Sequence, residues 1–342
     1  MRQIFSFQFI LVGLLTAVSL TLAATLTTLY DPSLNNTPDQ QGFLYLTQPF
    51  PPSQATQSFG GEVTVLDTTA VQSDYAGYQG RNSHVPTLDR SNGYRLNFQF
   101  MLESESHAGS DRNGDGIDDR AGFSVIVLSS DLKGLEMGFW LDEIWAQNDD
   151  SQQAANMFTH AEGVNFATDS GLTNYSLVIR DDAYLLETNG TCLLTGPLRN
   201  YTNHAGLLDP YETPNYLFLG DNTTSARGKA HLGNVSLDTT AVHVTPQTPP
   251  MLIASPSGNN VNLSWTVAAE KYELWSSQDP YLDPTSNACG ASSDCTILSN
   301  NSDVHTNALD ASLNVYVVRA TNSCGLVGDG WVKTAVFTFD IQ

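Results

Sequence analysis

The sequence predicts an all-β protein built from antiparallel sandwiches. Short apolar runs with a period of two recur along the chain, and clusters of Gly, Asn, Asp and Ser separate them. No stretch carries a helical apolar stripe of three or four turns. Many short strands without alternating helices are typical of a jelly roll or a similar antiparallel sandwich.

A proline-rich segment divides the 342-residue chain, which is longer than one typical domain. Residues 244–250 include Pro246, Pro249 and Pro250, which remove backbone donors and favour a stiff, extended linker. We therefore expect a jelly-roll domain at residues 25–243 and a second, smaller β-sandwich at residues 251–342.

The N-terminus has the three-part pattern of a secretory signal peptide. Met1 and Arg2 precede a mostly apolar run at residues 4–22, which ends in Ala23 and Ala24. We expect residues 1–24 to be removed on export, leaving a protein that is secreted or held at the cell surface, without membrane insertion. An uncleaved anchor helix is the alternative, because the run is nearly long enough to span a bilayer.

The charge excludes one class of partner. The chain has 36 acidic residues against 14 basic ones, a formal net charge of −22. Nucleic acids and anionic membranes bind to basic surfaces, so neither is an expected partner.

Alternation is clearest in the first domain at residues 94–100. Tyr94, Leu96, Phe98 and Phe100 point to one face, and the polar residues between them point to the other. Further strands are expected at residues 42–46, 122–128, 135–141, 175–179, 184–186, 216–219 and 232–237. One or two helical turns are possible at residues 149–158.

A loop at residues 111–119 has the spacing of a calcium site. Calcium takes about six to eight hard oxygen ligands, and a D-x-N-x-D-G-x-x-D pattern supplies them from alternate positions of a tight turn. Gly116 would provide the turn, but Gly122 stands where an EF-hand has its bidentate Glu, so a plain EF-hand is not expected. The alternative is a solvated polar turn. The expected ligands are Asp111, Asn113, Asp115, the backbone carbonyl of Ile117, and Asp119.

A second candidate site lies on the strand expected at residues 135–141. Trp140 shares a face with Glu136 and Asp142, opposite the apolar face. An exposed Trp beside carboxylates can stack on a sugar ring while the acids accept hydroxyl protons. The alternative is that a neighbouring loop covers Trp140. Glu136 and Asp142 would be roughly 20 Å apart along a strand, too far to cleave one glycosidic bond together.

His160 and Glu162 are expected on one strand face, where an imidazole beside a carboxylate can act as a base. No Ser or Cys nucleophile motif accompanies this pair, so a structural or solvated role is favoured. No catalytic residue is assigned.

The four cysteines are Cys192, Cys289, Cys295 and Cys324. In an exported chain they can form disulfides, and three full pairings are possible. Since Cys192 alone falls in the first domain, we expect it to be the odd one.

The second domain resembles a fibronectin type III module. Trp265, near the end of a strand at residues 260–265, and a strand at residues 316–320 match the family's core tryptophan and its Tyr-x-Val-x-Ala strand. The segment at residues 281–303, with Cys289 and Cys295, departs from a minimal module and is expected to be a loop pinned by a disulfide.

The first domain resembles the bacterial surface family called choice-of-anchor Y domain proteins. The segments that carry this resemblance are residues 119–125, 136–140, 144–147, 158–163 and 218–226. The resemblance implies a concanavalin-like, lectin-like jelly roll and a surface location, and it implies no settled activity. The family's usual sorting tail is missing, which puts anchoring in doubt.

Together these features predict an exported, calcium-stabilised, non-catalytic protein acting in adhesion or matrix contact. Its expected partner is an extracellular glycan or a surface or matrix protein. A lectin-like carbohydrate-binding protein is the first alternative, and a glycoside hydrolase of the concanavalin-like fold is the second.

Overall fold

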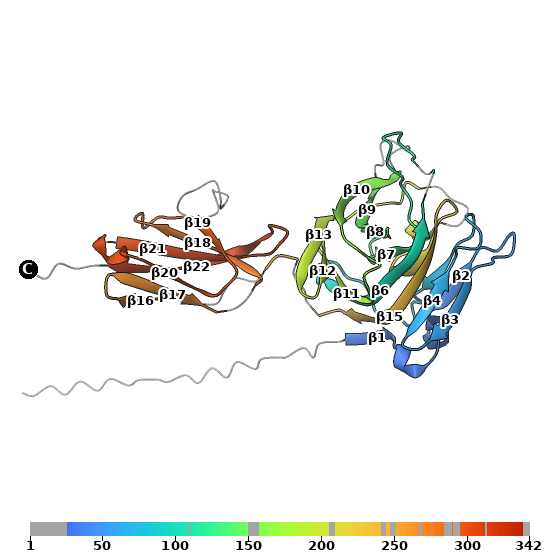
Figure 1. Ribbon diagram of the computed structural model, residues 1–342, viewed down its shortest axis with the longest axis horizontal. Coiled ribbons are helices and arrows are strands. Elements are labelled where there is room, and N and C mark those ends of the chain that lie inside the picture. Colours follow the sequence, from blue (N-terminus) through green and yellow to red (C-terminus); the bar gives the residue numbers. More distant parts are fainter. Residues whose placement is uncertain are drawn as a thin grey trace, which may run out of the picture.

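The computed structural model describes residues 26–107, 109, 111–149, 157–204, 209–240, 244–246, 251–266, 269–283, 289, 295–311 and 313–337. The expected signal peptide lies outside these residues, as do residues 247–250 of the expected linker and residues 150–156 of the possible helical turns. The described residues form two β-sandwiches, which lie side by side along the long axis of the molecule (Figure 1). The all-β prediction is confirmed.

The larger sandwich packs an eight-stranded sheet on a seven-stranded sheet, both antiparallel. The first has the order β13-β12-β11-β6-β15-β4-β3, with β1 also paired to β15, and the second has the order β10-β9-β8-β7-β14-β5-β2. The first sheet comprises β1 (Leu26–Tyr30), β3 (Thr56–Gly60), β4 (Val63–Asp67), β6 (Tyr94–Ser106), β11 (Thr173–Arg180), β12 (Ala183–Thr188), β13 (Thr191–Pro197) and β15 (Arg227–Asp238). The second comprises β2 (Leu44–Thr47), β5 (Ala76–Gln79), β7 (Ser124–Leu128), β8 (Gly134–Phe139), β9 (Glu143–Asp149), β10 (Met157–Asn165) and β14 (Tyr216–Asp221). Short 3-10 turns are η1 (Pro32–Leu34), η2 (Pro38–Gln41) and η3 (Pro210–Glu212).

The main core lies between the two sheets. Tyr94, Leu96, Phe98 and Phe100 of β6 are all buried in it, as their spacing predicts, and β8 contributes its own alternate residues from the other sheet. The Phe98 ring stacks on Tyr175 with centroids 5.2 Å apart.

The other face of the seven-stranded sheet is also buried. Side chains that alternate with the core residues form a second apolar layer, which includes Ile126, Tyr216 and Phe218. Two parts of the chain cover this face: residues 111–120, after β6, and residues 199–204 and 209–213, after β13. Packing here is close enough that a Cβ on Gly138 would lie 2.9 Å from the Trp145 ring, so this strand position needs glycine.

The smaller sandwich has one sheet of three strands and one of four. Their orders are β16-β17-β20 and β19-β18-β21-β22. The core between them includes Trp265, Tyr272 and Tyr316. The strands are β16 (Leu252–Ser257), β17 (Asn260–Trp265), β18 (Lys271–Ser277), β19 (Cys295–Leu298), β20 (Ser302–His305), β21 (Leu313–Thr321) and β22 (Val327–Phe337), with a 3-10 turn η5 (Ala308–Asp310) before β21.

A disulfide joins the two sandwiches. Cys192 of β13 bonds Cys324, which follows β21, so the expectation that Cys192 would be the odd cysteine is wrong. The pairing follows from packing across the junction: the Glu270 carboxylate accepts from the backbone N–H of Cys192 and from the hydroxyl and backbone N–H of Ser323. The second disulfide, Cys289–Cys295, closes the loop expected from sequence. Two disulfides indicate an oxidising compartment.

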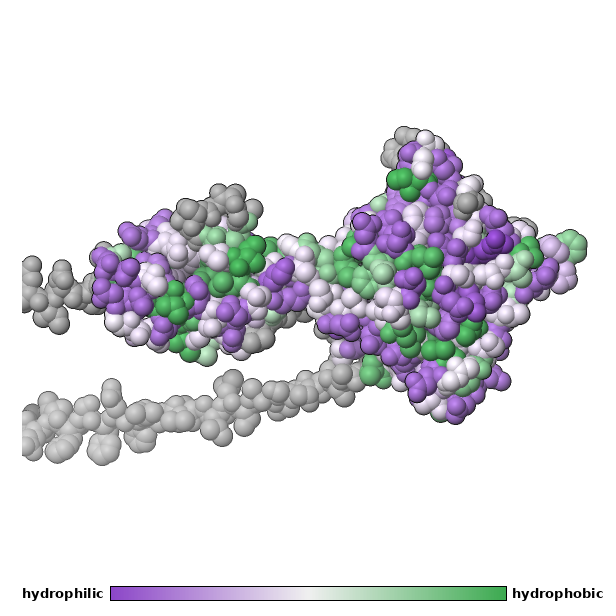
Figure 2. Space-filling model, in the orientation of Figure 1, coloured by the Kyte–Doolittle hydropathy of each residue, from purple (hydrophilic) through white to green (hydrophobic). Residues whose placement is uncertain are grey.

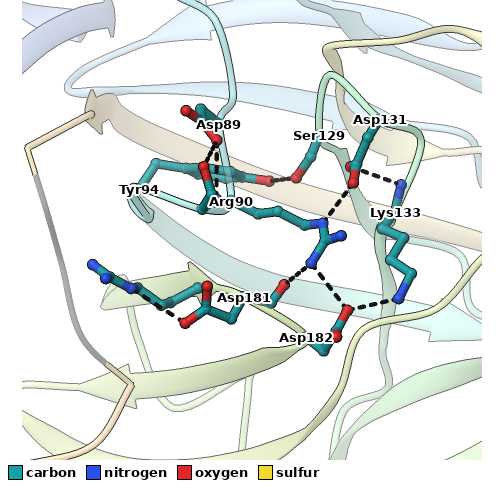
Figure 3. A network of polar contacts seen from close by, with 10 residues as sticks. Asp89, Arg90, Tyr94, Ser129, Asp131, Lys133, Asp181 and Asp182 are labelled. Atoms are coloured by element: carbon teal, nitrogen blue, oxygen red, sulfur yellow. Dashed lines mark hydrogen bonds and ion pairs between the residues drawn. The ribbon is translucent and has the colours of Figure 1, made fainter.

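A polar network joins turns of both sheets at one end of the larger sandwich (Figure 3). Arg90, in the turn before β6, bonds Asp131 in the β7–β8 turn at 2.7 Å and Asp182 in the β11–β12 turn at 3.0 Å. Lys133 also reaches Asp182, and the Tyr94 hydroxyl lies 2.9 Å from Ser129 Oγ beneath them. Several charges in one network fix turns better than isolated surface pairs do.

The surface seen in Figure 2 is mostly hydrophilic, with hydrophobic patches on both sandwiches. Over the residues described, no helix is both long enough and apolar enough to cross a bilayer.

Candidate functional site

A cavity of about 660 Å³ opens on the covered face of the seven-stranded sheet. Its base is formed by β14, β5 and the end of β2, and its walls come from the two covering segments and the start of β10. It is within the size range of small-ligand pockets. It is lined by Leu46, Thr47, Pro49, Tyr75, Gln79, Arg112, Arg120, Phe158, His204, Asp209, Pro210, Tyr211, Thr213, Tyr216, Phe218, Asn222, Thr223, Thr224 and Ser225.

Aromatic rings make the apolar wall of the cavity. Phe158 packs against Tyr211 with centroids 4.9 Å apart, and His204 meets Phe158 edge-on at 5.0 Å. Phe158 has a positive φ of 61°, at a register shift where β10 pairs with β9. A bulky residue in this conformation is strained, and such strain is concentrated at functional sites. Tyr75 lines the cavity half-buried, which leaves part of this ring open to a ligand.

A buried carboxylate fixes the polar groups beneath the rings. Glu136 is fully buried, and it accepts from the Tyr211 hydroxyl and, at 2.8 Å, from the Asn222 side-chain amide. Burial and the neighbouring Glu136 carboxylate raise the pKa of Tyr211 well above its ordinary value, so this phenol remains a donor. Asn222 then turns its Oδ1 atom away, buried and without a hydrogen-bond partner in the described part of the chain.

Two arginines bring positive charge to the cavity. Arg120 donates from Nε to Thr223 Oγ1 at 3.2 Å, and its guanidinium carbon lies 5.4 Å from the centroid of the Phe158 ring. Its Nη1 atom is buried and has no partner among the described residues. Arg112 belongs to the expected calcium loop and is exposed.

The expected calcium loop is a closed turn held by its own carboxylates. Asp111 accepts from the backbone N–H groups of Gly114 at 2.7 Å and Gly116 at 2.9 Å, and both glycines have positive φ. Asp115 accepts from the N–H of Ile117 at 2.8 Å, which together with the Asn113 amide lowers the pKa of Asp115. These oxygen donors are of the type that calcium takes.

Asp119 is fully buried, whereas the other expected ligands are exposed. It accepts from the N–H of Arg112 at 2.6 Å and from the N–H of His160 at 2.9 Å. Accordingly, no group of three or more His, Cys, Asp or Glu side chains is gathered closely enough to hold a metal ion within the described ranges. The donor types fit calcium, but the ion would have to draw the loop carboxylates together.

The structure does not bring Trp140, Glu136 and Asp142 together as an open platform. Trp140 is only 6% exposed, donates from Nε1 to the Arg120 carbonyl at 2.9 Å, and stacks on His107 with centroids 4.0 Å apart. Asp142 is exposed beyond the end of β8. The segment after β6 covers Trp140, so the alternative interpretation of this residue is the one observed.

His160 and Glu162 also have separate partners. His160 Nε2 lies 3.0 Å from Glu143, whereas Glu162 pairs with Arg199 and accepts from the Tyr184 hydroxyl. The register between β10 and β9 shifts between His160 and Gly163. The two side chains therefore do not share one face, as they would in a regular strand. Each residue therefore has a structural partner, which is the role favoured from the sequence.

The cavity was missed because its residues come from distant segments. Alternation places Leu217 and Leu219 in the main core, and the same period places Tyr216 and Phe218 on the opposite face. The signal for the cavity in the sequence was the pair of large aromatic residues, Tyr216 and Phe218, on the outward face of one strand. The partners that make them a cavity wall, Phe158 and Tyr211, cannot be read from local pattern.

No protein-family model matches the sequence, and a search of curated proteins found no match either. Among solved structures, the chain is similar to a carbohydrate esterase from a Shiga toxin-encoding bacteriophage, with 10% identity, coverage of 63% of this chain and 99% of that one, and a TM-score of 0.41. It is similar to the calcium-bound exoplasmic/lumenal domain of VIP36, with 10% identity, coverage of 63% and 91%, and a TM-score of 0.38. A Bacillus subtilis protein of unknown function with a galectin-like fold gives 8% identity, coverage of 64% and 98%, and a TM-score of 0.39. At this level of similarity, the functional argument rests on the cavity itself.

Proposed function

We propose that the protein is an exported, non-catalytic carbohydrate-binding protein and that the cavity beside Phe158 and Tyr211 is its sugar site. The observation that carries this proposal is the combination of an aromatic wall with polar groups inside one cavity. Sugar rings present apolar C–H faces that pack on aromatic rings and hydroxyls that need donors and acceptors. Tyr75 offers a partly open ring, and Asn222 and Arg120 offer an unpartnered acceptor and donor.

Calcium is proposed as a structural ion of the loop at residues 111–119. Asp111, Asn113, Asp115 and the Ile117 carbonyl would bind it, with Asp119 completing the set if the loop closes further. Arg112 lies within this loop and Arg120 directly follows it, so an ordered loop would hold both cavity arginines in place.

A binding role without catalysis is favoured by the carboxylates present. Glycan hydrolysis by the usual route needs two carboxyl groups facing one bond. Asp209 is the acidic residue among the described cavity lining, and its Oδ1 accepts from the N–H of Tyr211 at the start of η3. Glu136 lies below the wall with both oxygens occupied.

Adhesion or matrix contact outside the cell is the setting we propose. The two disulfides and the signal-like N-terminus support export, and the second sandwich, proposed as a fibronectin-like module, would serve as a spacer or a second contact. The relation to choice-of-anchor Y proteins remains part of this proposal.

Retention on immobilised polysaccharides tests the proposal. The calcium-loaded protein is run on a panel of neutral and acidic plant, microbial and animal glycans, beside Tyr75→Ala. Tyr281→Ala is the matched control, because Tyr281 is a ring 86% exposed in the smaller sandwich. We expect retention by the wild type and the control, and about fivefold or greater loss for Tyr75→Ala, since one stacked ring contributes on the order of 1 kcal/mol or more. Equal retention of all three proteins, or no retention on any glycan, would contradict the proposal.

A further inference from the structure

The charge of the cavity is opposite to that of the protein. The chain carries 36 acidic residues against 14 basic ones, yet the described residues that line this cavity include two arginines and one acidic residue. Ion pairs hold Arg90, Arg180, Arg199 and Arg319 elsewhere in the fold. Neither Arg112 nor Arg120 takes part in an ion pair with another described residue.

Both arginines line the cavity and keep donors that no described residue uses. Arg120 is held by Thr223 and by the face of Phe158, and its Nη1 atom is buried with no acceptor in the described structure. Leaving a buried guanidinium donor without a partner costs free energy. A ligand oxygen that accepts from this donor would remove that cost. Arg112 is on the same cavity lining, where its exposed guanidinium has no described hydrogen-bond partner.

The nearby carboxyl groups accept from other donors, although the charge of Arg120 also acts on the buried Asp221. Asp209 caps η3 through Oδ1, and Glu136 is occupied by Tyr211 and Asn222. Besides the two arginines, the described lining contains one more basic side chain, His204. It packs against the rings of Phe158 and Tyr211. The charged donors left over in the cavity therefore favour an anionic group, and the unpartnered Asn222 Oδ1 atom can accept from a sugar hydroxyl.

The net charge of −22 limits what kind of anion can bind. A densely charged polymer is repelled by the whole surface, whereas repulsion of a single carboxylate is screened beyond about 8 Å at physiological ionic strength. A guanidinium binds a carboxylate in a two-point fork that is roughly twice as strong as neutral hydrogen bonds.

We propose that the cavity selects an acidic sugar, with the carboxylate of a uronic acid residue bound by Arg112 and Arg120 and the ring packed on the aromatic wall. This inference rests on the proposed carbohydrate-binding function and names the class of its ligand. It makes Arg112 and Arg120 the residues that determine specificity.

The test compares each uronic acid with its own uncharged form. Trisaccharides of galacturonate, glucuronate and mannuronate, and their methyl esters, are titrated calorimetrically into the full mature chain at one fixed calcium concentration. At least one acid is expected to bind about tenfold or more tightly than its ester. Arg112→Gln should remove this preference, and Arg120→Lys, which keeps the charge but not the fork, should reduce it.

Arg81→Gln serves as the control, because Arg81 is an exposed arginine outside the cavity and its loss changes the net charge equally. It should keep the preference for the acid. If neutral glycans bind and no acid binds more tightly than its ester, or if Arg112→Gln leaves the preference unchanged, the acidic-sugar inference is wrong while the sugar site stands. If no sugar of either kind binds, the proposed function itself is wrong.

Discussion

Glu136 shows what a local pattern predicts about a single residue and where it stops. The period of two places Leu135, Met137 and Phe139 in the core and Glu136 on the opposite face, and the structure confirms this division. The same pattern suggests that Glu136 is open to solvent, which is wrong. Residues 199–204 and 209–213 fold over that face, and Tyr211 bonds the carboxylate. A contact between residues 75 positions apart leaves no trace in the local sequence.

Asp221 provides a prediction at the residue scale. It is fully buried at the end of β14, where burial raises its pKa well above the ordinary value although Thr68 and the N–H of Thr223 donate to it. A raised pKa in the folded state means that the protonated form stabilises the fold at low pH and that this contribution is lost as pH rises through the folded-state pKa. Asp221→Asn should thus gain stability relative to the wild type as the pH rises above the ordinary Asp pKa of about 4, as measured by urea unfolding.

The asparagine can accept from Thr223 and donate to Thr68, so the two proteins should be similar in stability at the acid end. Asp169→Asn, which removes an exposed carboxylate, is the control and should show a smaller change. If the difference in free energy of unfolding between the wild type and Asp221→Asn does not vary with pH, this role for Asp221 is ruled out.

At the scale of elements, strands with clear alternation were predictable and strands defined by their neighbours were not. Residues 94–100 and 216–219 lie in β6 and β14 because their alternate residues are large and apolar. By contrast, β1 is a five-residue segment with the sequence LTTLY, and it becomes a strand by pairing with β15, more than 190 residues later. Its burial is a product of that pairing and not of its own pattern.

The loop at residues 111–119 is the element whose role is most open to direct test. If it binds calcium, calcium should raise the melting temperature of the wild type. At a hundredfold excess over the dissociation constant, the free energy of unfolding should increase by about 2.7 kcal/mol. Asp115→Ala should melt lower in calcium and show no further change with chelator, as followed by differential scanning calorimetry. Magnesium provides the control, because it dehydrates reluctantly and demands stricter geometry. A chelator-dependent shift that survives in Asp115→Ala would place the ion elsewhere.

At the scale of the whole molecule, two independent cores are joined by a disulfide in addition to the polypeptide chain. Each sandwich buries its own aromatic cluster, and Cys192–Cys324 crosses between them beside Val178, Leu185 and Leu326. Sequence predicted both sandwiches from their strand patterns. It could not predict the link, because cysteine pairing depends on how the two bodies dock.

Removing the link should loosen the junction without unfolding either part. In a Cys192→Ser, Cys324→Ser double variant we expect near-wild-type circular dichroism, a broader range of interdomain distances in X-ray scattering, and faster proteolysis within residues 244–250. The matched control is the Cys289→Ser, Cys295→Ser double variant, which removes the loop disulfide but keeps Cys192–Cys324, and it should not alter the junction. Collapse of the larger sandwich in the first variant would show that the link supports its core.

The central claim is that sugar binds in the cavity on the covered face of the seven-stranded sheet. A crystal structure with the best-retained oligosaccharide tests it most directly. We predict electron density for a sugar ring between Tyr75 and Phe158, with its polar groups within hydrogen-bond distance of Arg120 and Asn222. Density at another place, such as the polar groove of Asn97, Gln99 and Asn174 on the outer face of the eight-stranded sheet, with the cavity empty, would contradict the claim.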